Sequence, residues 1–162
     1  MQIPSKARAV IIGGGVIGCS IAYHLGKLGW KDVVLLERKQ LTCGTTWHAA
    51  GLIAQLRATQ NMTRLAKYSQ ELYFGLEAET GVATGFKRNG SITVALTDER
   101  MEELRRSAAM ARAFGVEIDE ITPDDIAGRY PGLATGDVVG GVWLPKDGQA
   151  DPVNITQALA KG

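Results

Sequence analysis

The chain has 162 residues, of which 45% are hydrophobic and 22% are charged, and this composition excludes wholesale disorder. Its net charge of +1 argues against a nucleic-acid-binding protein, and no apolar run approaches the roughly 18 residues that span a bilayer. We therefore expect neither nucleic acid nor membrane as a partner. The two cysteines provide no disulfide framework, so we expect a reducing compartment: the cytoplasm, or the mitochondrial matrix in a eukaryote.

The first 37 residues predict a strand, a helix and a second strand. Residues 9–12 form a continuous apolar run, which is typical of a strand buried on both faces of a parallel sheet. Residues 32–37 form a similar run that ends in Glu37. Between them, apolar residues recur at helical spacing and predict one apolar face of a helix: Ile17, Ile21, Leu25 and Leu28.

The remaining chain predicts alternating helices and strands after a loop at 40–60. A helix at 61–80 has an apolar stripe, and residues 91–96 alternate with the period of a half-buried strand. Thr97 and Thr122 each precede acidic residues, as helix N-caps do. Further strands are expected at 116–118 and 138–144, and a last helix is expected after Asp151.

A glycine motif between the first strand and the first helix predicts a dinucleotide site. In Gly13-x-Gly15-x-x-Gly18, the first glycine permits a tight turn, the second admits a pyrophosphate and the third allows close helix packing. The helix start offers free N–H groups to phosphate. Glu37 can accept hydrogen bonds from a ribose and disfavours NADP. The alternatives are a glycine-rich turn in an unrelated protein, and NAD in place of FAD.

Longer segments of the chain resemble the D-amino-acid-oxidase-like flavoproteins, and more narrowly dimethylglycine and sarcosine dehydrogenases. The resemblance is carried by Val10-Ile-Ile-Gly-Gly-Gly-Val-Ile-Gly18, Thr45-Thr-Trp-His-Ala-Ala-Gly-Leu52, Tyr130-Pro-Gly-Leu133 and Asp151-Pro152. It implies an α/β fold with a Rossmann-type FAD-binding start and the beginning of a mixed α+β substrate domain, in an incomplete chain. The implied domains are an FAD segment at 1–80, the start of the substrate domain at 81–150 and a truncated return helix at 151–162.

The same resemblance implies a set of FAD-binding residues. The pyrophosphate would meet Gly13, Gly15, Val16, Ile17 and Gly18. Glu37 would hold the ribose, with Arg38 beside the adenine. A loop would wrap towards the isoalloxazine ring through Gly44, Thr45, Thr46, Trp47, His48, Ala49, Ala50, Gly51 and Leu52. In dimethylglycine dehydrogenases the histidine that matches His48 is attached to the flavin 8α-methyl carbon; the alternative is a hydrogen-bonding His48 beside an unattached flavin.

The implied function is oxidation of a small N-methylated amino acid, such as dimethylglycine or sarcosine, by hydride transfer to flavin. The small amine is the expected substrate, the electron acceptor stays open, and tetrahydrofolate belongs only to longer relatives. No catalytic residue and no metal site is predicted. Two alternatives are a related glycine or D-amino-acid oxidase and a non-catalytic nucleotide-binding module.

Overall fold

The computed structural model describes residues 4–162, which divide into two compact units. Unit 1 comprises the described residues up to Leu52, together with Glu71–Phe86 and Ala150–Gly162. Unit 2 comprises Ile53–Gln70 and Lys87–Gln149. The chain therefore leaves unit 1 and returns to it twice.

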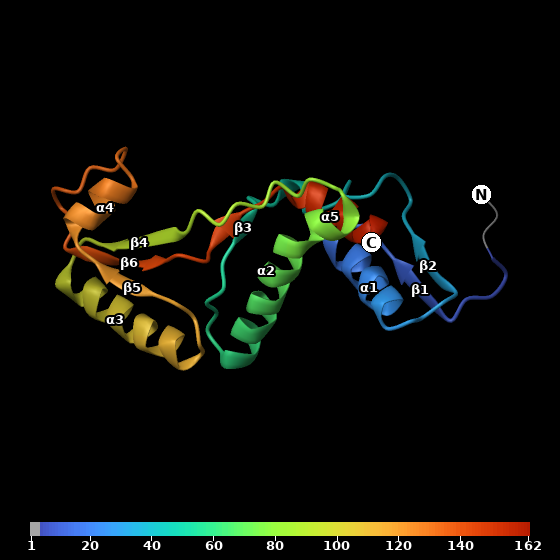
Figure 1. Ribbon diagram of the computed structural model, residues 1–162, viewed down its shortest axis with the longest axis horizontal. Coiled ribbons are helices and arrows are strands. Elements are labelled where there is room, and N and C mark those ends of the chain that lie inside the picture. Colours follow the sequence, from blue (N-terminus) through green and yellow to red (C-terminus); the bar gives the residue numbers. More distant parts are fainter. Residues whose placement is uncertain (1–3) are drawn as a thin grey trace. The chain divides into compact units, whose positions relative to one another are not determined.

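Unit 1 contains the predicted βαβ arrangement. Strands β1 (Ala9–Ile12) and β2 (Val33–Leu36) pair in parallel, with Ala9 opposite Val33, and α1 (Val16–Lys27) connects them. Figure 1 shows α1 beside the two strands, in agreement with the contacts between these elements. The predicted α/β start is thus confirmed.

The buried face of α1 differs from the predicted apolar face. Gly18, Cys19 and Tyr23 are buried, whereas Ile17 is 73% and Leu28 is 74% exposed. The reason is a second helix, α5 (Pro152–Lys161), which packs against α1 and buries its own apolar side chains beside Cys19 and Tyr23. Of the predicted apolar face, Leu25 is half-buried, whereas Ile17, Ile21 and Leu28 are exposed.

Helix α2 (Gln60–Thr80) follows the predicted range and contributes residues to both units. Leu76 of the predicted apolar stripe is fully buried in unit 1. Met62 and Leu65 of the same stripe are more than half exposed. Within unit 2, the buried residues of this helix are the polar Thr63 and Gln70. Both side chains form hydrogen bonds, which compensate for their burial.

Unit 2 is built on an antiparallel sheet in the order β4-β6-β5. Strands β4 (Ser91–Ala95) and β5 (Asp119–Ile121) both pair with β6 (Gly140–Leu144). The strand expected at 116–118 lies three residues later in the chain. Val116 and Ile118 are nevertheless buried, because the segment before β5 packs on the core instead of joining the sheet.

Both helices of unit 2 begin at the predicted threonines. Thr97 accepts a hydrogen bond from the Arg100 N–H at the start of α3 (Asp98–Ala113). Thr122 and Asp125 form a reciprocal capping box at the start of α4 (Pro123–Arg129). Each cap satisfies N–H groups that the helix itself leaves free.

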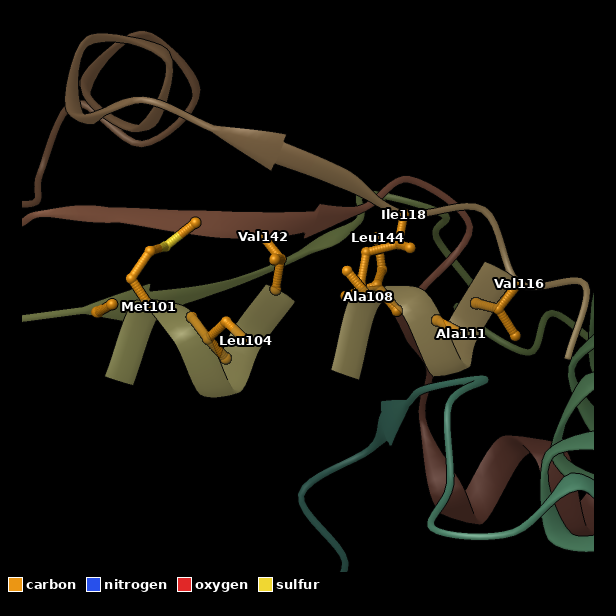
Figure 2. Packing of buried hydrophobic residues seen from close by; sticks show 9 residues of the cluster. Met101, Leu104, Ala108, Ala111, Val116, Ile118, Val142 and Leu144 are labelled. Carbon is orange, nitrogen blue, oxygen red and sulfur yellow. The ribbon is translucent and has the colours of Figure 1, made fainter. Parts of the chain in front are cut away.

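The largest hydrophobic core of unit 2 lies between α3 and one face of the sheet. Figure 2 shows side chains of α3 gathered opposite those of β6, with Val116 and Ile118 at one end. The members from these two elements are Met101, Leu104, Ala108, Ala111, Val142 and Leu144. A second cluster, which contains Ile121, Ile126 and Val138, lies under α4.

Three short elements complete the described chain. They are the 3-10 helix η1 (Thr46–His48), β3 (Leu52–Ile53) and β7 (Gly148–Gln149). Of these, η1 belongs to unit 1 and contacts α5 of the same unit. No helix among residues 4–162 is long and apolar enough to cross a membrane.

Candidate cofactor-binding site

The turn between β1 and α1 has a backbone geometry that requires glycine. Gly13 has φ +110°, and its N–H donates to the Leu36 carbonyl at 2.8 Å. A side chain at Gly18 would place its Cβ only 1.9 Å from the Gly13 carbonyl oxygen. The start of α1 therefore lies against the turn at a distance that only glycine allows.

The first turn of α1 presents its N–H groups without an acidic side chain of its own helix to neutralise them. Gly15 is the N-cap residue and contributes no side chain. The Val16 N–H donates to the Thr46 hydroxyl oxygen at 3.0 Å. A helix N-terminus carries partial positive charge, so this end of α1 attracts an anion.

Glu37, at the end of β2, is held against the same turn. Its Oε2 accepts the Gly14 N–H at 2.8 Å, and its Oε1 accepts the Lys39 N–H at 3.0 Å. The Cys43 thiol also donates to Oε1, at 3.6 Å. These donors lower the pKa of Glu37, with the Gly14 N–H as the largest cause. Glu37 is therefore a fixed, ionised carboxylate at neutral pH.

A cavity of about 530 Å³ in unit 1 joins these features. Its lining combines the glycine turn, the start of α1, Glu37 and the loop before η1. The predicted site residues in the lining are Gly13, Gly15, Val16, Ile17, Gly18, Glu37, Gly44, Thr45, Thr46 and Ala49. The structure thus gathers residues that the sequence separates by up to 36 positions, from Gly13 to Ala49.

The other predicted site residues lie outside that lining. They are Arg38, Trp47, His48, Ala50, Gly51 and Leu52. Trp47 and His48 are both exposed, with ring centroids 3.8 Å apart and planes inclined by 34°. Gly51 is buried at φ +75°, and its carbonyl accepts the Ala150 N–H at 2.9 Å.

Three apolar side chains complete the lining and were missing from the sequence prediction: Ile11, Ile12 and Ile21. Ile11 and Ile12 end β1 directly before the glycine turn, and Ile21 lies one helical turn beyond Ile17. The i, i+4 spacing from Ile17 was the sequence signal that could have identified Ile21 as part of the site.

Residues 8–162 match the DAO family, which is described as FAD dependent oxidoreductase. The chain belongs to this family. The matched residues include its glycine turn, Glu37 and the loop before η1. The predicted recognition and fold class are confirmed by this match.

Individual relatives of this DAO chain are enzymes and, in one case, a regulatory protein. Over almost the whole chain (98–99%) it is 43% identical to human dimethylglycine dehydrogenase, 40% identical to human sarcosine dehydrogenase and 39% identical to the mouse pyruvate dehydrogenase phosphatase regulatory subunit. All three are named as mitochondrial. The chain spans less than a fifth of the length of each relative.

A solved structure shows the same fold. The L-proline dehydrogenase of P. horikoshii superimposes with a TM-score of 0.91 at 32% identity. The match covers 98% of the DAO chain and 41% of the dehydrogenase. The mixed α/β architecture described above is therefore that of an FAD-dependent oxidoreductase.

Two features of the DAO chain fit a dinucleotide, one at the glycine turn and one at Glu37. A Cβ at Gly13 would point into open space, and one at Gly15 would meet only the Thr46 hydroxyl. The backbone is thus accessible where a pyrophosphate approaches. The fixed Glu37 carboxylate supplies hydrogen-bond acceptors at the distance along the chain that ribose binding requires.

Proposed function

We propose that the chain supplies the FAD-binding N-terminal part of an enzyme that oxidises a small N-methylated amino acid. The observation that carries this proposal is the cavity formed by the glycine turn, Glu37 and the loop at 44–49. The identity to dimethylglycine and sarcosine dehydrogenases favours their substrate class. FAD, when bound, supplies the hydride acceptor for oxidation of a C–N bond.

In this proposal the protein binds and orients FAD through two parts of unit 1. The start of α1 contacts the pyrophosphate through Gly13, Gly15, Val16, Ile17 and Gly18. Glu37 binds the ribose, and Arg38 lies beside the adenine. The loop from Gly44 to Leu52 extends towards the isoalloxazine ring.

His48 is the proposed covalent anchor of the flavin. It is exposed in η1, so its imidazole is accessible to a ring that binds beside the loop. A neutral imidazole is a competent nucleophile near neutral pH. The small side chains of Ala49 and Ala50 leave room for close approach. These features support attachment through the imidazole to the 8α-methyl carbon.

The wider assignments follow the same resemblance. Residues 1–80 and 151–162 form the FAD-binding segment, and 81–150 begin the substrate domain. The compact units support separate roles for the β1–β2 and β4–β6–β5 regions. We further propose the mitochondrial matrix as the location if the organism is eukaryotic, since the three relatives are mitochondrial.

Acid precipitation tests the covalent anchor. The protein, expressed from its whole reading frame, is precipitated with acid and the pellet is examined for flavin absorbance. We expect yellow colour in the pellet of the unchanged protein and colour in the supernatant of His48→Ala. His24→Gln is the matched control, because His24 lies within α1 and bonds to Ser20 of the same helix. Retention of flavin in the His48→Ala pellet would contradict the assignment.

The regulatory subunit among the relatives favours a second candidate, a non-catalytic nucleotide-binding module. A substrate screen separates the two. Dimethylglycine, sarcosine and glycine are added to the flavin-loaded protein without oxygen. Loss of flavin absorbance with an N-methylated amine supports the dehydrogenase. Loss with glycine alone supports a glycine oxidase, and no loss with any of them supports the module.

A further inference from the structure

We infer that Thr46 is a positioning residue, which fixes the His48 loop on the N-terminus of α1. This inference rests on the proposed function and concerns how the chain's own residues prepare the flavin site. The observation behind it is the hydrogen bond from the Val16 N–H to Thr46 Oγ1, which joins residues 30 positions apart at 3.0 Å.

This bond is the last of three links between the segment after β2 and the glycine turn. The Gly14 N–H donates to Glu37 Oε2 at 2.8 Å, and the Thr42 N–H donates to the Gly14 carbonyl at 2.9 Å. The first two links end at Thr42, four residues before Thr46. Thr46 therefore holds the part of the segment that continues into η1.

Thr46 also begins the turn that carries His48. The Ala49 N–H donates to the Thr46 carbonyl at 3.1 Å, and the His48 N–H donates to the Thr45 carbonyl at 3.1 Å. Because these bonds make η1 a single hydrogen-bonded turn, fixing the Thr46 side chain fixes the backbone of His48. Trp47 and His48 are exposed, and η1 also contacts α5.

Gly15 makes this link possible. A Cβ at Gly15 would lie 3.0 Å from Thr46 Oγ1, which is tighter than ordinary packing. The absence of a side chain at Gly15 thus leaves room for the Thr46 hydroxyl as well as for a pyrophosphate. Gly15 and Thr46 act as a pair, and a methyl group at Gly15 displaces the threonine hydroxyl.

Positioning matters because covalent attachment requires the imidazole and the 8α-methyl carbon to meet in a narrow geometry. A displacement of about 1 Å can slow a reaction by about a hundredfold. Threonine suits the task because its branched Cβ restricts χ1 and its hydroxyl accepts the N–H. Serine keeps the acceptor, whereas valine keeps the shape and loses the acceptor.

The test compares Thr46→Val and Thr46→Ser in the protein expressed from its whole reading frame. The rate of flavin attachment is measured at saturating FAD from the colour of acid pellets. FAD affinity is measured separately in a His48→Ala background, by flavin fluorescence. We expect Thr46→Val to slow attachment at saturating FAD by about tenfold or more, whatever the substitution does to FAD affinity, and Thr46→Ser to restore the rate.

Hydrogen exchange of the FAD-free protein gives a second readout that does not depend on attachment. We expect the Val16 amide and the amides of 47–49 to exchange about fivefold faster in Thr46→Val than in the parent. Thr135→Val, the same substitution in unit 2, is the control and leaves these amides unchanged.

Two outcomes would overturn the inference. One is a Thr46→Val variant with unchanged attachment and exchange. The other is an unchanged attachment rate at saturation with FAD affinity lowered tenfold, which makes Thr46 a direct ligand of the cofactor. If the parent protein binds FAD without a covalent bond, the His48 anchor fails, and the exchange comparison alone decides the role of Thr46.

Discussion

Glu37 keeps both carboxylate oxygens in hydrogen bonds to N–H and thiol donors, and these donors lower its pKa. For this single residue, the lowered pKa gives the direction in which pH changes the stability of unit 1. The hydrogen bonds of the charged form stabilise unit 1 above the ordinary pKa of glutamate. That stabilisation is lost only as the pH falls through the lowered pKa of the folded state.

FAD affinity is therefore expected to be independent of Glu37 ionisation between about pH 5 and pH 8. Glu37→Gln replaces one acceptor oxygen by an NH₂ group that faces an N–H donor. We expect about 10- to 100-fold weaker FAD binding, because the neutral amide loses both a charge and an acceptor that the carboxylate offers. Fluorescence titration in the His48→Ala background checks this. Equal FAD affinity with and without the Glu37→Gln substitution would contradict the ribose-binding role.

Two glycines of α1 form a matched pair for testing the close approach of the helix to the turn. Gly18→Ala places a methyl group against the Gly13 carbonyl, whereas Gly26→Ala places one in open space. We expect Gly18→Ala to lower the free energy of unfolding by about 1–3 kcal/mol or more and to weaken FAD binding. Gly26→Ala is expected to be neutral or stabilising by about 0.5–1 kcal/mol. Urea denaturation gives both values, and similar results for the pair would show that the turn tolerates a side chain at Gly18.

At the scale of elements, local sequence patterns correctly predicted the strands and helix starts that depend on neighbouring residues. The apolar runs predicted β1 and β2, and the caps Thr97 and Thr122 predicted where α3 and α4 begin. The β5 strand was misplaced by three residues, because Val116 and Ile118 have the apolar character of a strand but pack on α3 as a loop.

The buried face of α1 and part of the site depended on distant residues. Ile17 carries a strong apolar signal, but α5 covers the opposite side of the helix, and α5 begins more than 120 residues later. The glycine turn and Glu37 could be predicted as site residues, because they directly follow the predicted strands β1 and β2. The bond between Val16 and Thr46 has no local signal, because nothing in the spacing of the loop specifies which hydroxyl reaches α1.

The core between α3 and the sheet gives an element-scale prediction. Leu104 is 5% exposed and packs in this core, whereas Leu96 is 56% exposed. Leu104→Ala is expected to lower the free energy of unfolding of unit 2 by about 2–5 kcal/mol, since it leaves a cavity. Leu96→Ala, the control, is expected to change it by less than about 0.5 kcal/mol. Denaturation followed by tryptophan fluorescence, to which Trp143 of β6 contributes, measures the difference; equal midpoints would mean that the α3 core is not the stabilising contact.

At the scale of the whole molecule, the described chain exposes many large apolar side chains of unit 1. Ile12 is 87%, Leu28 is 74% and Val10 is 55% exposed. Exposed apolar surface of this kind promotes association. The 162-residue chain, studied alone, is therefore expected to bind hydrophobic dyes and to self-associate.

Replacing Val10 and Leu28 tests this expectation without altering residues of the cavity lining. The double variant Val10→Thr/Leu28→Gln is expected to raise the soluble concentration and to lower dye binding, because both side chains are exposed. Ile11→Thr is the contrasting variant, since Ile11 is 9% exposed and its replacement destabilises the fold. Light scattering measures association, and an unchanged association state in the double variant would place the associating surface elsewhere.

The return of α5 to α1 also has a consequence for synthesis on the ribosome. Unit 1 needs residues 150–162 for its helix pair, whereas all described residues of unit 2 precede residue 150. The strands β4, β5 and β6 therefore leave the ribosome before α5, the partner of α1, does. The side of α1 that α5 covers is therefore accessible to chaperones until residues 152–161 have emerged.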